Sequence, residues 1–162
     1  MGSEMCIRDR SKGLAQACYD HVRDTGPNGI VGDFGTDGST PETRAKRYVE
    51  ASSVEEDLIY GDAGSPTMSI LFQLVNSGDP NRSMRKNILD KHFTHVGVSC
   101  GCHSEVVDMC CMLFGEDVKE KDSSLSVDIP PKLEECTPYS PDTKGIKSDS
   151  PKDTWKLSLI HI

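Results

Sequence analysis

The most specific stretch of this chain is residues 82–97, RSMRKNILDKHFTHVG. Its first half is polar, and the three cations beside Asn87 are Arg82, Arg85 and Lys86. Its second half supplies apolar anchors, which are Ile88, Leu89 and Phe93. Because apolar side chains gain free energy on burial, the pattern predicts a basic turn that is held against a core and leads into a strand. We interpret the rest of the chain as scaffold for this turn.

The bulk properties exclude several classes of function. The chain has 162 residues, which fits one domain with a core of its own. Its net charge of −8 repels a phosphate backbone, so we expect no nucleic-acid partner. We also expect no transmembrane segment, because no stretch approaches the roughly 18 consecutive apolar residues that a spanning helix needs.

The two ends differ in character from the middle. Residues 1–10, MGSEMCIRDR, and 156–162, KLSLIHI, look like translated cloning scars, so we set both apart as non-native. Residues 116–155 are acidic, rich in proline and serine, and predict a disordered tail. The folded domain is then residues 11–115, with an incomplete first helix and any signal peptide lying upstream.

Local signals predict three helices, which span residues 12–25, about 41–51 and 66–76. The first ends at Gly26-Pro27. Thr40-Pro41 supplies an N-cap and a tolerated first-turn proline for the second helix, and Ser39 with Glu42 is an alternative capping box. Ser65-Pro66 repeats the cap-and-proline signal for the third.

Two strands are predicted at residues 94–100 and 105–114, joined by a short connection at 101–104. One face of the second strand carries Val107, Met109, Cys111 and Leu113. The other face carries Val106, Cys110, Met112 and Phe114. A strand that is apolar on both faces is usually covered on both, so we expect an α+β fold, an α-β-α sandwich with helices above and below the sheet.

Three blocks in order resemble the CAP superfamily of SCP-like, cysteine-rich secretory proteins. They are DFGTDGSTPETRA at 33–45, EDLIYG at 56–61 and the stretch at 82–97. The family wording is H-x-G-x-D-G-S-x-P-x-x-R, then E-N-[IL]-x-x-G, then G-H-R-x-N-I-L-x-x-x-[FY]-x-x-V-G. The resemblance covers roughly residues 11–115. It implies an antiparallel sheet between helices, and an extracellular, secreted protein.

The resemblance also implies a cavity with two histidines and two acidic residues, through which some members bind zinc. This chain has Asp33 and Met84 at the histidine positions, keeps Glu56 at one acidic position, and has Asp57 beside it where asparagine is usual. Asp79 is our candidate for the second acid. Since a thioether is a poor zinc ligand, we expect no zinc and no other cofactor, and either a remodelled or a vestigial pocket.

Other matches to the family motifs have structural roles in this interpretation. Arg85 and Asn87 can tie loops together through carbonyls and carboxylates. Arg44 is expected to pair with Asp37 or with Glu56. Asn81 begins the sequon Asn-Arg-Ser and is a glycosylation candidate if the chain is secreted.

The cysteine count is compatible with disulfides. Setting Cys6 aside with the leader leaves six cysteines, an even number, although buried free thiols are the alternative. The disulfide candidates are Cys100, Cys102, Cys110 and Cys111. These cysteines with His103 have the wrong spacing for a zinc knuckle, and adjacent strand residues point to opposite faces. We expect Cys18 and His21 to be a packed core pair, and no metal at His92 and His95.

The hypothesis is a secreted, non-enzymatic, CRISP-like SCP-domain binding module with a remodelled cavity. Its partner is unknown, with a small apolar ligand such as a lipid or sterol, or a cell-surface protein, as candidates. One alternative is a metal-dependent enzyme with a rearranged acidic site. Another is a structural or interaction module without a ligand.

Overall fold

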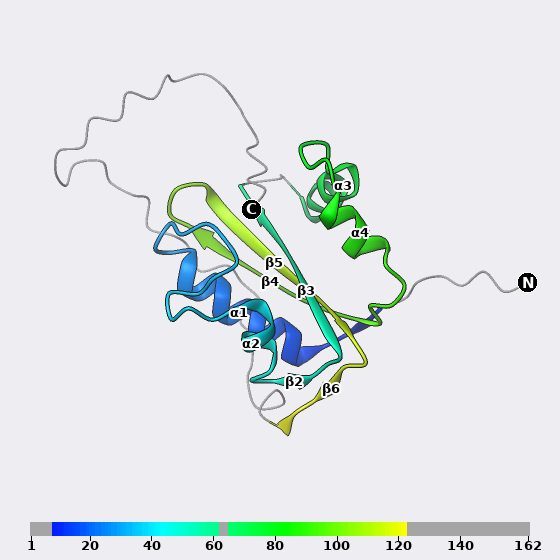
Figure 1. The fold of residues 1–162 in the computed structure, drawn as a ribbon. Helices are drawn as coiled ribbons and strands as arrows, with labels where there is room; N and C mark the ends of the chain where they lie inside the picture. Colours follow the sequence, from blue (N-terminus) through cyan, green and yellow to red (C-terminus); the bar gives the residue numbers. More distant parts are fainter. Residues whose placement is uncertain (1–7, 62–64, 123–162) are drawn as a thin grey trace, which may run out of the picture.

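A four-stranded sheet forms the middle layer of the fold in the computed structural model, which describes residues 8–61 and 65–122. In spatial order its strands are β1 (Asp9–Arg10), β4 (His95–His103), β5 (Val107–Glu116) and β3 (Ser53–Tyr60). The helices are α1 (Lys12–Thr25), α2 (Pro41–Ala45), α3 (Pro66–Val75) and α4 (Ser83–Leu89). Helices α1 and α2 lie on one side of the sheet, and α3 and α4 on the other (Figure 1). The predicted α-β-α sandwich is confirmed.

The hairpin of β4 and β5 is longer than predicted. The two strands pair antiparallel from His95 opposite Gly115 to His103 opposite Val107. The connection is therefore residues 104–106, and the expected turn at 101–104 was wrong. Strand β3 pairs antiparallel with β5 and was not predicted, because its run of acids, Glu55 to Asp57, hides the alternation of a strand.

Helix α1 has the predicted bounds and holds the larger half of the core. Ser11 caps it by accepting a hydrogen bond from the Leu14 amide, and the Gly26 amide closes the other end on the Val22 carbonyl. Its buried apolar side chains are Leu14, Ala17, Cys18 and Val22. They cluster with Met109, Cys111 and Leu113 of β5, the face that the sequence predicted.

Gly97 on β4 explains why the motif at 82–97 ends in glycine. A Cβ at this position would overlap the backbone of Leu14 and Ala15 in α1. The absence of a side chain therefore lets α1 and β4 approach closely.

Helix α2 is much shorter than predicted. Thr40 caps it in a capping box with Thr43, not through Ser39 and Glu42. The chain leaves the helix after Ala45, and Val49–Glu50 forms β2, which pairs with β6 (Lys119–Glu120) in a separate two-stranded sheet. The predicted extension to residue 51 was wrong because this strand pairing replaces the helix.

The basic stretch forms helix α4 from Ser83 to Leu89, with Arg82 as its N-cap residue, and not the predicted turn. The Asp79 carboxylate accepts hydrogen bonds from the Asn81 amide at 2.7 Å and the Ser83 amide at 2.6 Å, which orders the start of the helix. Phe93 is buried in a cluster with Ile59, Met112 and Phe114, and Ile88 packs against it. Leu89, expected as an anchor, is 57% exposed.

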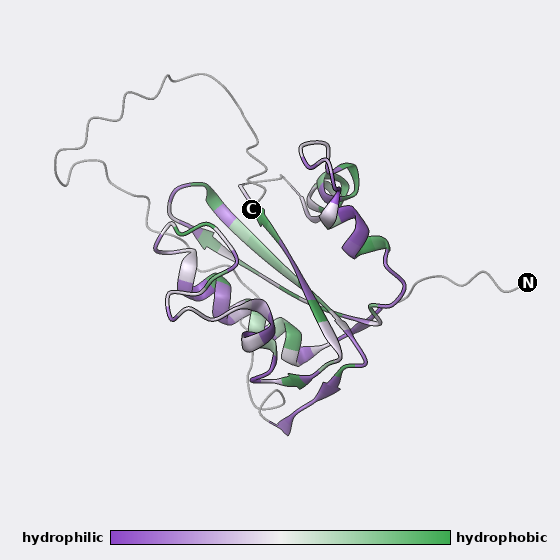
Figure 2. Ribbon diagram, in the orientation of Figure 1, coloured by the Kyte–Doolittle hydropathy of each residue, from purple (hydrophilic) through white to green (hydrophobic). Residues whose placement is uncertain are grey.

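Helix α3 presents apolar side chains to solvent. Met68, Ile70, Leu71 and Val75 are 36–55% exposed, although the helix is strongly hydrophobic (Figure 2). Gln73 and the C-cap residue Asn76 are instead fully buried. An ordinary amphipathic helix buries its apolar side and exposes its polar side, whereas α3 exposes several apolar side chains and buries a polar one.

Both ends of the described domain reach beyond residues 11–115. Arg8 donates hydrogen bonds to four carbonyls around the end of α4, those of Asn87, Ile88, Asp90 and Phe93. Asp9–Arg10 pairs parallel with β4, and β6 lies within the stretch that we assigned to the tail. The rest of the predicted leader and tail, residues 1–7 and 123–162, lies outside the described residues.

One disulfide joins α1 to the sheet, and another links β4 to β5 within the sheet. Cys18 and His21 are both fully buried, as expected for core residues, and Cys18 of α1 is bonded to Cys111 of β5, a partner that the sequence did not predict. Cys100 is bonded to Cys110 across the hairpin, and Cys102 is also disulfide-bonded.

Within residues 8–61 and 65–122, none of the helices combines the length and apolar character that a bilayer-spanning segment requires.

Candidate functional site

Asp33, Glu56 and Met84 line one cleft of about 440 Å³ beside β3. Asp33 comes from the loop after α1, Glu56 from β3 and Met84 from the first turn of α4. The remaining lining residues are Gly32, Glu55, Asp57, Leu58, Tyr60, Asp79, Asn81, Ser83 and Asn87. Residues from all three motif blocks thus meet around a single hollow.

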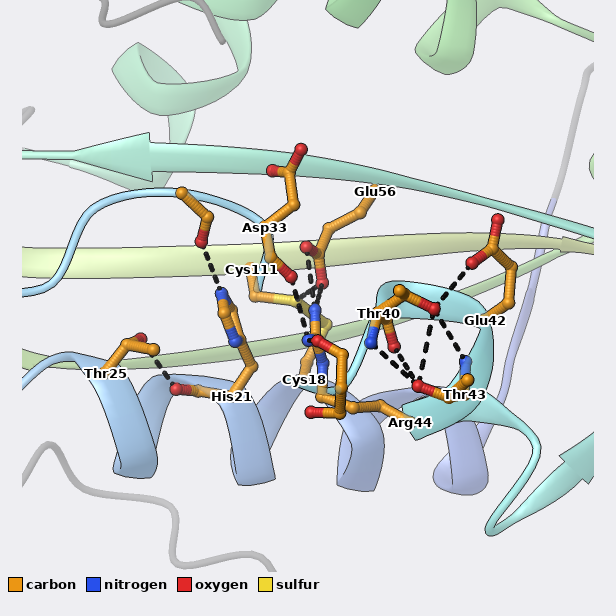
Figure 3. Close-up of polar contacts among 12 residues, drawn as sticks. Cys18, His21, Thr25, Asp33, Thr40, Glu42, Thr43, Arg44, Glu56 and Cys111 are labelled. Atoms are coloured by element: carbon orange, nitrogen blue, oxygen red, sulfur yellow. Dashed lines mark hydrogen bonds and ion pairs between the residues drawn. A yellow bond between two sulfur atoms is a disulfide. The ribbon is translucent and has the colours of Figure 1, made fainter. Parts of the chain in front are cut away.

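Glu56 is held by a buried ion pair with Arg44. The two Nη2 to carboxylate distances are 2.8 and 3.0 Å, and the side chains are 1% and 2% exposed (Figure 3). Arg44 also donates to the carbonyls of Asp33 at 2.9 Å and Ser39 at 3.0 Å. Arg44 therefore fastens the 33–39 loop to β3. Of its two expected partners, Glu56 is the one observed.

The electrostatics of Glu56 are set by two opposing effects. Burial raises the pKa of its carboxyl, and the Arg44 guanidinium acts in the opposite direction. The bidentate pairing stabilises the charged form of Glu56, and the Arg44 charge largely cancels the negative charge that Glu56 brings to the cleft.

Asp37, the other acid that was expected to pair with Arg44, binds the exposed Arg47 at 2.9 Å and accepts a hydrogen bond from the Ser39 amide.

Asp57 is the neighbour of Glu56 on β3 and points to the opposite side of the sheet. Its Oδ1 accepts a hydrogen bond from the Asn87 side chain at 2.8 Å. Its Oδ2 is buried without a hydrogen-bond partner among the described residues. Burial raises the pKa of Asp57 to about 6, although the Asn87 amide opposes the shift. Only one of the two carboxylate oxygens of Asp57 therefore has a hydrogen-bond partner among the described residues.

Asp33 and Glu55 complete the acidic lining. The Asp33 carboxylate points away from Arg44 in Figure 3, and only the backbone carbonyl of this residue contacts the guanidinium. Burial raises the pKa of Asp33 and of Glu55. The Arg44 charge opposes the shift of Asp33 without cancelling it, and the nearby Glu42 charge adds to the shift of Glu55.

The donor set does not fit a zinc ion. Asp33 offers oxygen, but Met84 offers a thioether, and both Glu56 oxygens are engaged by Arg44. The Asp79 carboxylate is used to order the start of α4. Among the residues that the structure describes, no three His, Cys, Asp or Glu side chains are grouped closely enough to hold one metal ion.

The other predicted residues lie outside or at the rim of the cleft. Arg85 donates to the Leu74 carbonyl at 2.8 Å and so ties α4 to α3. Asn81, the glycosylation candidate, is exposed. His92 is exposed and contacts Asp90, and His103 packs edge-on against the Tyr60 ring.

Sequence reasoning missed two side chains that position the Asp33 loop. The Tyr60 hydroxyl accepts a hydrogen bond from the Gly32 amide, and a His21 ring nitrogen bonds the Gly32 carbonyl, each at 3.0 Å. Burial and the nearby Arg44 lower the pKa of His21 to about 4, so the ring is neutral. Tyr60 lies in the EDLIYG motif at 56–61, so its position in a family motif could have identified it as a site residue.

Comparisons with known proteins agree with the motif blocks. The model of the cysteine-rich secretory protein family, CAP, matches residues 9–114. An outer surface protein of Borrelia burgdorferi is similar in structure with a TM-score of 0.54 and 16% identity, covering 67% of this chain and 77% of that one. An extracellular protein of Bacillus anthracis with an SCP domain has a TM-score of 0.55 and 17% identity, covering 68% of this chain and 34% of its own. None of the curated proteins matches the chain significantly.

Proposed function

The chain belongs to the cysteine-rich secretory protein (CAP) family, and from that premise we propose that it is a secreted, non-enzymatic binding module that takes a small ligand in the cleft beside β3. The observation that carries the proposal is the meeting of Asp33, Glu56 and Met84 around one hollow of about 440 Å³. This volume lies within the range of small-molecule sites.

The chemistry of the lining supports binding rather than catalysis. The Glu56 carboxylate has both oxygens on Arg44, so it is poorly placed to accept a proton from a substrate. Met84 can neither ligate zinc well nor act as an acid or base. Secretion is supported by the disulfides, which persist in oxidising compartments.

A cleft-filling substitution tests the proposal. We expect Met84→Trp to abolish the rise in melting temperature that a bound ligand gives to the wild-type domain in a thermal-shift screen. The screen contains lipids, sterols and small polar and charged metabolites. Leu89→Trp is the matched control, because Leu89 lies on the same helix but is 57% exposed and does not line the cleft.

Two outcomes would replace the proposal. Stoichiometric zinc in elemental analysis of the purified domain, lost on Asp33→Ala, would favour a metal-dependent enzyme. A screen in which no compound raises the melting temperature of the wild type would favour a structural module without a ligand.

A further inference from the structure

The cleft is lined by acids without a cation. Among the described residues that line it, the acids are Asp33, Glu55, Glu56, Asp57 and Asp79, and none is Lys, Arg or His. The charge of two of these acids is already compensated. Glu56 is paired with Arg44, and Asp79 accepts backbone hydrogen bonds at the start of α4.

Asp33, Glu55 and Asp57 are therefore the cleft acids that form no side-chain ion pair among the described residues, although the Arg44 charge partly offsets that of Asp33. Asp57 is only 2% exposed, and its Oδ2, which has no hydrogen-bond partner within residues 8–61 and 65–122, belongs to a side chain of the cleft wall. A buried carboxylate oxygen without a donor costs free energy. A ligand that supplies an N–H donor and positive charge would remove this cost if the Asp57 side chain, whose Oδ1 is held by Asn87, turns Oδ2 toward the cleft on binding.

The arrangement favours an organic cation over a metal ion. In the described part of the chain the carboxylates do not converge in a group that could hold one metal ion. The cleft wall also contains Leu58, Tyr60 and Met84, which add apolar surface to the acidic lining. Spread charges together with apolar surface fit an elongated ligand whose charged ends are joined by methylene groups.

We propose that the cleft binds an organic cation, an alkylammonium or alkylguanidinium group with a short apolar body, with Asp57 and Asp33 as its carboxylate partners. This inference rests on the proposed binding function and names the chemical class of its ligand. The same chemistry occurs in free amines and in Lys or Arg side chains of proteins, so the test must separate the two sources.

Calorimetric titration of the domain with putrescine and with 1,4-butanediol tests the charge requirement, because the two compounds have the same length and differ in their end groups. We expect saturable binding of putrescine, weakened by added salt, and no binding of butanediol. Equal binding of both, or no binding of putrescine and agmatine, would overturn the inference. Saturation by calcium chloride at the same site would also overturn it.

Variants locate the site. Asp57→Asn should weaken putrescine binding at least tenfold, and Asp33→Asn should also weaken it, whereas Glu50→Gln should not, because Glu50 lies on β2 outside the cleft. Unchanged binding by Asp57→Asn and Asp33→Asn would contradict the assignment. Stronger binding of agmatine than of the peptide Gly-Arg-Gly identifies a free amine as the source, and the reverse order identifies a protein side chain.

The outcome also separates this inference from the proposed function. If a lipid or sterol stabilises the domain through the cleft while the amines do not bind, only the cation inference fails. If neither class binds, both fail.

Discussion

On one face of the sheet α1 turns its apolar side chains inward, whereas on the other face α3 leaves Leu71 and Val75 about half exposed and buries Gln73. The consecutive acids of β3 show the same contrast. Glu56 faces α1 and α2 and receives two hydrogen bonds from Arg44, while Asp57 faces α4 and receives one from Asn87. The first face is built for stability, and the second leaves polar groups available.

The largest expected effect comes from breaking the ion pair on the α1 face. Arg44→Met leaves Glu56 buried without its partner, and we expect it to lower the free energy of unfolding by about 3–5 kcal/mol, measured by urea denaturation. The double variant Arg44→Met/Glu56→Leu is the control and should recover much of the loss. A single variant as stable as the wild type would show that the pair contributes little.

Leucines from the two faces allow a direct comparison. Leu14 on α1 is 0% exposed and Leu71 on α3 is 45% exposed. We expect Leu14→Ala to cost about 3 kcal/mol because it leaves a cavity, and Leu71→Ala to cost about 0.5 kcal/mol or less. Equal losses in urea denaturation would mean that the α3 face is buried in solution, for example against a second copy.

The buried carboxyl of Asp57 predicts a pH dependence. Its pKa is raised from 3.8 to about 6 in the folded state, so the folded form prefers the neutral carboxyl. Stability should therefore fall by up to about 3 kcal/mol as the pH rises from 4 to 6. Asp57→Asn should remove this part of the fall, seen as the difference between variant and wild type in urea denaturation at each pH. An unchanged pH profile would refute the assignment.

The smallest effect concerns the buried polar side chain of α3. Gln73 is fully buried, and its Oε1 has no partner in the described part of the chain. Replacing it by leucine should stabilise the domain by about 1 kcal/mol, because an apolar side chain of similar volume needs no hydrogen bond. Thermal unfolding followed by circular dichroism would detect this gain. A loss would show that a buried water or another group satisfies the amide.

The comparison also explains what the sequence could predict. Alternating apolar residues on both faces of β5 predicted a sheet covered on both sides, because burial requires that pattern. Periodicity identified α3 as a helix but did not reveal which way it faces, since orientation depends on what the other elements leave uncovered. The acidic run Glu55 to Asp57 hid β3, because each acid is accommodated by a partner or a cleft that only the folded chain supplies.

The candidate site was predictable in its members but not in its interactions. The motif blocks supplied Asp33, Glu56 and Met84, which line one cleft. The partner of Arg44 remained open between two acids, because a motif gives spacing along the chain and not distance in space. The bond between Cys18 and Cys111 was missed for the same reason, as the two residues are 93 positions apart.

The disulfide between Cys18 and Cys111 determines what happens when a protease cleaves the chain. Residues 33, 56 and 84 all lie between Cys18 and Cys111, inside the covalent ring that the bond closes. A protease that cleaves once anywhere in this ring leaves the fragments attached, and they separate only after reduction. A nicked domain would therefore still hold the walls of its cleft together and migrate as one species on a non-reducing gel.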